Sequence, residues 1–540
     1  MSGPVGLNFY DFLVFSAYML VTVALGFWVG RRGKNTARSY FLGDRKIPWY
    51  VVGASMVAAD ISTEHFIANV GGAYRYGVVV ASGSWNSWII YSLLIWIFLP
   101  YYVRTGLYTM PEFLERRYNP ACRYIFSVSL VVGYVAAIIG GSLYAGGVAL
   151  QSIFGLEVYY GIVLFAVVAG IYTIYGGLLS AAWTDLLQII ILLGAGVLVP
   201  ALALHQAGGL GAVVREFPEK FQMFHAPSDK PFPFTGVFTG FLTVGIWYSC
   251  TSQHIVQRVL GAKDEWHARM GVISAGFLHV ITPCFFVLPG ILAFKLYPHL
   301  ARPEHAYLLL VKNLIPTGLK GLILAAMAGA LMSMLATVLN SAATLVTLDL
   351  YKKLLNPNVT DAQQVRFGRW SGTAILIAGI GFGCAYAQST RSLLENVQDV
   401  FFYIAPPFAV TFTLGILWRR ANATAALATI ISGFGFTWFL SAWLFPHVRA
   451  LRPYNVYQHR ALLAWIFCML VMIVVSLLTP PPASEKTEGI IWSPRYALLP
   501  AKDQARYRGL KDFRIWWALF VAIVLSIYGF FIWFRFQHPW

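Results

Sequence analysis

The chain has 540 residues, of which 58% are hydrophobic and only 11% are charged, a composition typical of proteins that cross a membrane many times. The formal net charge of +17 suggests a nucleic-acid partner at first sight, but the lysines and arginines stand in short loops between apolar runs. That distribution is the one that orients membrane helices. The composition therefore excludes a soluble multidomain protein, and we expect a lipid bilayer and no nucleic acid around the chain.

Apolar stretches of about 20 residues, enough to cross the hydrocarbon core, recur along the whole chain. They predict an all-α polytopic protein with about fourteen transmembrane helices, at 9–30, 48–72, 82–104, 122–150, 157–176, 182–204, 236–258, 268–296, 318–352, 368–388, 394–418, 423–445, 460–480 and 514–535. The first span has no basic residue before it and runs into Arg31 and Arg32, which predicts a retained helix with its N-terminus outside. Alternation then places the C-terminus outside as well, and the absence of another targeting segment favours the plasma membrane.

The distribution of basic residues among the loops agrees with this orientation, with one exception. The loops predicted to be cytoplasmic carry Arg31, Arg32, Lys34, Arg38, Arg45, Lys46, Arg104, Arg116, Arg117, Arg258, Lys263, Lys352, Lys353, Arg366, Arg369, Arg419 and Arg420. The loop with Arg449, Arg452 and Arg460 is the exception, because it falls outside. Segments 205–235 and 297–317 are predicted outside, and 481–513, opened by three prolines, is predicted to be a solvated cytoplasmic linker.

The second span is interrupted halfway by polar residues. Between Gly53 and Gly72, an apolar run contains Asp60, Ser62, Thr63, Glu64 and His65. An acidic side chain at the centre of a spanning helix costs about 2.5–3.5 kcal/mol, so it normally faces a cavity, a partner charge or a ligand. The seventh span, from Gly245 to Arg258, is also polar in mid-membrane. Broken helices at corresponding positions of two five-helix halves indicate an inverted-repeat transporter with its site at the midplane.

Five motifs follow one another in order between Trp49 and Arg420. They are TMPEFLERR at 109–117, YGGLLSAAWTDLLQ at 175–188, QR at 257–258, NS at 340–341 followed by DLYKK at 349–353, and APP at 405–407. Together they resemble the motifs of the sodium/solute symporter family, which contains the sodium/glucose cotransporters. The resemblance implies a LeuT-type fold, with two inverted five-helix repeats and alternating access around a central site. It divides the chain into an extra helix and loop at 1–47, a ten-helix transport core at 48–420, and three peripheral helices with a linker at 421–540.

The resemblance also implies a sodium site between the second and ninth spans. Its ligands would be backbone carbonyls of Ala58, Ile61 and Ala330 and the hydroxyl of Ser333. Met334 stands where the family has a second hydroxyl, and a thioether is a soft, weak acceptor whereas sodium is a hard cation. Two carboxylates, Asp60 and Asp185, could compensate by supplying charge near the site or by carrying a proton. Sodium-coupled, proton-coupled and uncoupled transport therefore all stay open, with sodium as the expected ion.

The family's solute contacts fall on a mixed set of residues in this chain. The positions expected to bind solute are Asp60, Glu64, His65, Ser84, Ser87, Tyr248, His279 and Gln398. Ser84, His279 and Gly245 stand where sugar-transporting members have a glutamate, a lysine and an asparagine. Because a site built to hydrogen-bond its substrate rejects one that leaves polar groups unpaired, we expect a small polar organic solute that is sugar-like or polyol-like, but not specifically glucose.

Several of these residues also have a simple structural interpretation. Asp60 could cap the helix break, His65 and His279 could be interior histidines, and Ser333 could bond the carbonyl one turn back. Asp349, followed by Lys352 and Lys353, is typical of a surface cluster at a helix end.

The sequence thus predicts a secondary active transporter that moves a small polar solute together with a cation. The alternatives are a proton-coupled or uncoupled transporter of the same fold and a solute sensor without transport. We find no HExxH, no GxSxG, no paired cysteine and histidine set and no glycine-rich phosphate loop, so we expect neither an enzyme nor a cofactor other than sodium. The solute, the stoichiometry and the oligomeric state are left open.

Overall fold

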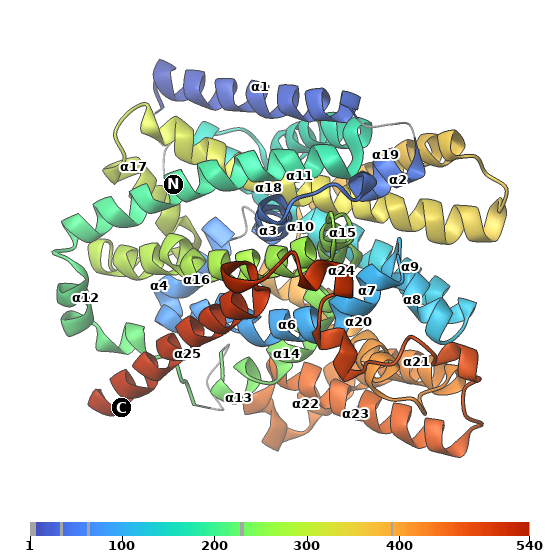
Figure 1. Cartoon of the computed structure of the whole chain (residues 1–540). Coiled ribbons are helices and arrows are strands. Elements are labelled where there is room, and N and C mark those ends of the chain that lie inside the picture. Colours follow the sequence, from blue (N-terminus) through green and yellow to red (C-terminus); the bar gives the residue numbers. More distant parts are fainter. Residues whose placement is uncertain (1–6, 33–35, 62–64, 227–231, 390–392, 539–540) are drawn as a thin grey trace.

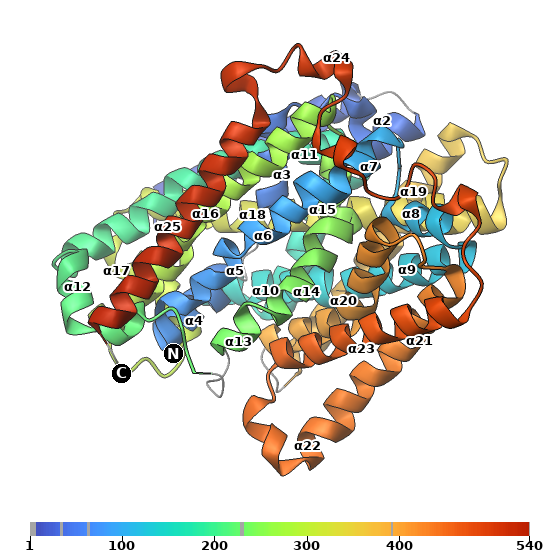
Figure 2. The same cartoon turned by 60° about the horizontal axis from the view of Figure 1, so that its bottom comes forward.

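The chain folds into one bundle of apolar helices. The computed structural model describes residues 7–32, 36–61, 65–226, 232–389 and 393–538. Within these residues, eleven helices are long and apolar enough to cross a membrane. Because a backbone in hydrocarbon must satisfy its own hydrogen bonds, these apolar sequences form helices. The helices lie side by side in one bundle (Figure 1), and a view turned by 60° shows the same arrangement (Figure 2).

The first half of the chain contains the first broken helix and the longest helix. Its helices are α1 (Phe9–Arg32), α2 (Ala37–Leu42), α3 (Trp49–Ala58), α4 (Val70–Tyr76), α5 (Ser82–Trp85), α6 (Ser87–Leu93), α7 (Leu99–Arg104), α8 (Met110–Arg117), α9 (Pro120–Gly133), α10 (Gly140–Phe154) and α11 (Val158–Gln206). α11 contains the predicted fifth and sixth spans, which meet at a kink at Gly177. This residue has a φ of 65°, and a Cβ there would lie 2.5 Å from the carbonyl oxygen of Tyr40, so glycine is required.

The second half contains the most deeply buried helix. Its helices are α12 (Leu210–Glu216), α13 (Phe234–Val237), α14 (Gly240–Gly245), α15 (Gln253–Leu260), α16 (Glu265–Leu296), α17 (Ala306–Leu314), α18 (Leu319–Thr344), α19 (Asp361–Ala387), α20 (Leu393–Leu417), α21 (Ala423–Phe439), α22 (Phe445–His447), α23 (Tyr457–Leu478), α24 (Ala501–Gln504) and α25 (Phe513–Gln537). Of an 18-residue apolar window in the stretch that begins with α18, 94% is buried inside the bundle, and α18 packs against α11, α1 and α19. α18 is therefore the central element of the fold.

Both predicted helix breaks are present. α3 ends at Ala58, and a π-helical turn begins again at His65. Ser62, Thr63 and Glu64, which the sequence places in this break, lie outside the described residues. In the seventh span, a π-helical segment at 246–251 ends at Ser252, which is extended with a ψ of 133°, and α15 begins at the next residue.

The loops predicted to share the cytoplasmic side lie at one end of the bundle. Arg45 donates to the carbonyl oxygen of Leu107 at 3.3 Å, and the Lys353 ammonium lies 3.3 Å from the carboxylate of Glu115. In Figure 1, the start of α1 lies at the top left of the molecule and the end of α25 lies at the bottom left, away from α8, α9 and α19.

Residues 481–512 are not the solvated linker that the sequence predicts. The Trp492 indole donates to the carbonyl oxygen of Trp96 at 2.8 Å, and the Tyr507 ring stacks on Trp266 with 4.3 Å between ring centroids and 4° between planes. Arg269 donates to the carbonyl oxygens of Tyr496 and Ala497. Aromatic side chains therefore hold this segment against the end of the bundle. The prolines and charges of the segment predict a solvated linker instead.

Candidate functional site

Asp185, on α11, contacts side chains from three other helices at the centre of the bundle. It accepts hydrogen bonds from Ser55 on α3 and from Ser333 on α18, both at 2.5 Å. The Arg258 guanidinium on α15 lies 3.7 Å from it, and all four side chains are fully buried. A charged group in this position needs a partner of opposite charge and further hydrogen bonds. Asp185 has both.

Arg258 ties the same cluster to a second position on α18. Its Nε donates to Ser55 at 3.2 Å, and its Nη2 donates to Thr337 at 2.5 Å. Because the guanidinium stands against Asp185, the buried pair carries no net charge. A cation near Ser333 would therefore lie beside a neutral pair and not beside a free carboxylate.

The four positions expected to supply backbone or hydroxyl ligands to sodium, Ala58, Ile61, Ala330 and Ser333, are all buried. Ala58 and Ile61 flank the end of α3, and Ala330 stands one turn before Ser333 on α18. The Ser333 hydroxyl bonds to Asp185 and not to the carbonyl one turn back. Met334 is buried beside it, with 7% of its surface exposed, and brings no oxygen ligand. Carbonyl and hydroxyl oxygens are ligands that suit sodium, and Met334 leaves one such oxygen fewer than the resemblance implies.

Asp60 lies with two histidines just beyond the end of α3. Its carboxylate is 29% exposed and stands 3.7 Å from Nε2 of His279 on α16. His65, whose ring packs on Phe286 of α16, is within electrostatic reach of both. Among the described residues, neither ring nitrogen of His279 has a hydrogen-bond partner. The structure thus brings together Asp60, His65 and His279, which the sequence placed on two different spans.

α6 contributes a serine near the same cluster. Ser87 is buried, and its hydroxyl finds no hydrogen-bond partner in the described part of the chain. Tyr91, one helical turn further along, packs its ring on His279 with centroids 5.6 Å apart. Ser84, on α5, is half-buried. The absence of a side chain at Gly245 also has a physical reason, because a Cβ there would lie 2.0 Å from Cδ1 of Ile90.

Tyr248 packs between the second broken helix and α20. Its ring centroid is 4.7 Å from that of His254 and 5.9 Å from that of Phe401. Phe401 stands three residues after Gln398 on α20, so Tyr248 lies about one helical turn from the level of Gln398. The remaining predicted contact, Glu64, falls outside the described residues.

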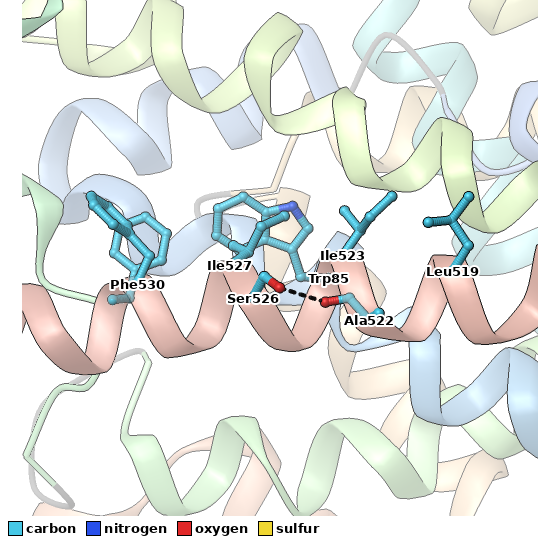
Figure 3. A pocket seen from close by; sticks show the side chains of 8 residues that line it. Trp85, Leu519, Ala522, Ile523, Ser526, Ile527 and Phe530 are labelled. Atoms are coloured by element: carbon cyan, nitrogen blue, oxygen red, sulfur yellow. Dashed lines mark hydrogen bonds between the residues drawn. The ribbon is translucent and has the colours of Figure 1, made fainter.

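An apolar groove of about 680 Å³ lies beside α25 and is distinct from this cluster. Figure 3 shows Trp85 facing α25 residues that include Leu519, Ile523 and Phe530. The hydroxyl of Ser526 is already bonded to the carbonyl oxygen of Ala522 at 2.8 Å. A groove lined in this way offers a polar solute little to bind.

Comparison with known proteins settles the family. The sequence model described as the sodium:solute symporter family matches residues 40–433. The chain belongs to this family. A sodium/glucose cotransporter of Vibrio parahaemolyticus is 32% identical to this chain over 509 residues, and the match covers 88% of this chain and 91% of that protein. A human sodium/myo-inositol cotransporter is 29% identical over 535 residues, covering 88% of this chain and 74% of that protein.

Solved structures confirm the LeuT-type fold of the symporter. A Na⁺-coupled sialic acid symporter in a substrate-bound outward-open state aligns with a TM-score of 0.79 at 22% identity, covering 88% of this chain and 99% of that one. A nucleobase-cation-symport-1 family transporter in a closed conformation aligns with a TM-score of 0.50 at 16% identity, covering 83% and 97%. The fold class predicted from the broken helices and the motifs is therefore confirmed.

A second buried carboxylate corrects one expectation from the sequence. Asp349 is fully buried, so it does not belong to a surface cluster with the lysines that follow it. It accepts hydrogen bonds from Nε of Arg123 at 2.6 Å and from the hydroxyl of Thr109 at 2.8 Å. Arg123 also pairs with Glu115 on α8. The partners come from residues more than two hundred positions away, which local charge spacing does not show.

Sequence reasoning did not assign a role to several residues of the symporter's centre. The sequence places Arg258 in a motif and in a cytoplasmic loop, whereas the structure buries it beside Asp185. The sequence patterns do not single out Ser55, Tyr91 or His254. One signal was available: a buried carboxylate such as Asp185 requires a cation partner, and Arg258 ends the other polar span. The rest depends on packing between helices.

Proposed function

We propose that this symporter couples the inward movement of a small neutral polyhydroxy solute, such as a sugar or cyclic polyol, to a cation gradient, with sodium as the cation. The cluster of Asp60, His65 and His279 at the end of α3 is the observation that carries the proposal. A carboxylate accepts hydrogen bonds from hydroxyl groups, and a neutral imidazole both donates and accepts. The same carboxylate disfavours an anionic solute, because like charges at a partly desolvated site repel.

The other predicted contacts would complete the site around the solute. Ser87 would supply a buried hydroxyl from α6, and Ser84, about one helical turn before Ser87, is half-buried. Tyr248 would form an aromatic floor, with Gln398 on α20 as a further hydrogen-bonding group. Glu64 belongs to the same proposed set. The names of the glucose and myo-inositol cotransporters among the relatives support a solute with many hydroxyl groups.

Sodium would be held where α3 ends beside α18, by the carbonyls of Ala58, Ile61 and Ala330 and the hydroxyl of Ser333. Bound there, it would supply the positive charge whose downhill entry drives accumulation. Ser333 links this position to Asp185 directly, whereas Asp60 would act from the solute side. Residues 48–420 would form the transport core, with 1–47 and 421–540 around it, in the plasma membrane with both termini outside.

A second candidate function is transport that is proton-coupled or uncoupled. Two observations favour it: Met334 removes one oxygen donor, and Arg258 already neutralises Asp185. A solute sensor that binds without transport is the third candidate, and it differs from both in the absence of accumulation.

The solute and the ion can be identified by thermal stability of the purified protein. A ligand that binds only the folded state raises stability by RT ln(1 + [L]/Kd). Melting would be compared in sodium chloride and choline chloride at equal ionic strength, with neutral sugars, polyols and the corresponding uronates. We expect a sodium-specific shift that a neutral polyhydroxy solute increases and its uronate does not. A larger shift with uronates would contradict the proposal, and a solute shift indifferent to sodium would favour the second candidate.

A further inference from the structure

The second broken helix is capped from outside its own span. Ser252, which precedes α15, makes no side-chain cap to that helix. Instead, the hydroxyl of Tyr134 accepts the backbone N–H of His254 at 3.1 Å. Tyr134 comes from a π-helical segment at 134–139, between α9 and α10. Since the first N–H groups of a helix have no partner within it, Tyr134 satisfies one that the break exposes.

Three buried side chains lie within hydrogen-bonding distance of one another at this cap. The Tyr134 and Ser252 oxygens are 2.7 Å apart, and Nδ1 of His254 lies 2.9 Å from Ser252 and 3.2 Å from Tyr134. All three residues are buried without exposed surface. If Tyr134 donates to Ser252 and Ser252 donates to Nδ1, each hydroxyl proton is used once. The ring proton of His254 is then on Nε2, which has no hydrogen-bond partner among the described residues.

The His254 ring also contacts the proposed floor of the solute site. Its centroid lies 4.7 Å from that of Tyr248, with 77° between the rings, which is an edge-to-face contact. The imidazole of His254 therefore contacts Tyr134 and Ser252 on one side and packs against the Tyr248 ring on the other. Tyr248 precedes the break and His254 follows it, so this contact spans the break.

We propose that His254 is a positioning residue. Tyr134 and Ser252 hold its imidazole, the imidazole holds the Tyr248 ring in the position that contacts the solute, and this linkage sets the affinity for solute. The inference rests on the proposed function, because it takes Tyr248 as a solute contact. Loss of the Nδ1 hydrogen bond lets the imidazole move, and loss of the ring removes the contact with Tyr248. In both cases Tyr248 is no longer held in the position that contacts the solute. The sodium residues are on α3 and α18 and are not part of the linkage.

Uptake kinetics in proteoliposomes test this directly. His254→Phe keeps a ring but loses Nδ1, and His254→Asn keeps a polar group but loses the ring. Both should raise the solute KM roughly tenfold, the effect of one buried hydrogen bond or ring contact, and leave the maximal rate and the sodium half-saturation within about twofold. Thr251→Val is the matched control, because in the described part of the chain that hydroxyl bonds only the carbonyl oxygen of Trp247, one turn back at 2.8 Å.

A double variant separates the two proposals. If Tyr248→Ala raises KM and His254→Phe adds nothing in that background, the linkage is supported. If Tyr248→Ala raises KM but His254→Phe has no effect, or has its full effect in both backgrounds, the role of His254 is overturned while the floor assignment stands. If Tyr248→Ala leaves KM unchanged, the floor assignment itself fails. Should His254→Phe not yield folded protein, Tyr134→Phe removes a single oxygen and is judged by the same outcomes.

Discussion

The carboxylate of Asp185 faces the guanidinium of Arg258 at 3.7 Å, with both side chains fully buried. The pair connects α11 to α15, and the serines that bond it add α3 and α18. Every helix at the proposed sodium position is therefore attached to a single buried ion pair. A change in that pair acts on stability and on cation binding together.

Asp185→Asn should destabilise the protein strongly, because it leaves the charge of Arg258 buried without a counter-charge. Loss of one partner of a buried pair costs about 3–5 kcal/mol. The double variant Asp185→Asn, Arg258→Gln should recover part of that loss. Thermal unfolding in detergent of the two single variants and the double variant measures this. A double variant whose loss equals the sum of the single losses would show that the two side chains do not interact.

Met334→Ser should lower the sodium concentration that gives half-maximal uptake, because it adds a hydroxyl oxygen next to Ser333. The matched control is Met334→Leu, which has a similar volume and no oxygen, and it should leave that concentration unchanged. Sodium titrations of uptake in proteoliposomes measure both. An identical sodium response in the two variants would argue that position 334 does not face the ion.

Asp60→Asn should raise the solute KM about tenfold or more, since hydrogen bonds to a charged acceptor contribute about 1.5–3 kcal/mol. Asp11→Asn is a useful control, because that buried carboxylate accepts the N–H groups of Gly318 and Gly321 at the start of α18 and is on a peripheral helix. It should lower stability but leave KM unchanged. Equal KM values for Asp60→Asn and the native protein would remove Asp60 from the solute site.

Glu115 should make stability depend on acid pH. Burial alone would raise the pKa of Glu115, but its ion pairs with Arg123 and Lys353 outweigh burial and hold that pKa below the ordinary glutamate value. A carboxyl whose pKa is lower in the folded state stabilises the protein above the unfolded pKa, and this stabilisation is lost as the pH falls through the folded value. Melting temperatures between about pH 6 and pH 3 should therefore fall more steeply for the native protein than for Glu115→Gln. Parallel curves would contradict this.

The helical architecture follows from the sequence because hydrocarbon leaves an apolar segment of twenty residues few options. Polar residues inside the second and seventh spans mark the two breaks for the same reason, since each costs free energy unless it has a partner. What the sequence does not show is which partner each one finds. Asp349 stands beside two lysines in sequence but pairs with Arg123, and residues 481–512 dock through Trp492 and Tyr507 despite their prolines and charges. Such pairings depend on how helices pack across the bundle.

Accumulation of a neutral polyhydroxy solute against its gradient tests the account most directly. Proteoliposomes would be loaded with choline and diluted into sodium or into choline, with radiolabelled glucose or myo-inositol outside. Sodium-coupled symport predicts a transient internal solute concentration above the external one in sodium only, and a sodium ionophore that dissipates the gradient should abolish it. Equilibration without accumulation under both conditions, or binding without entry, would contradict coupled symport.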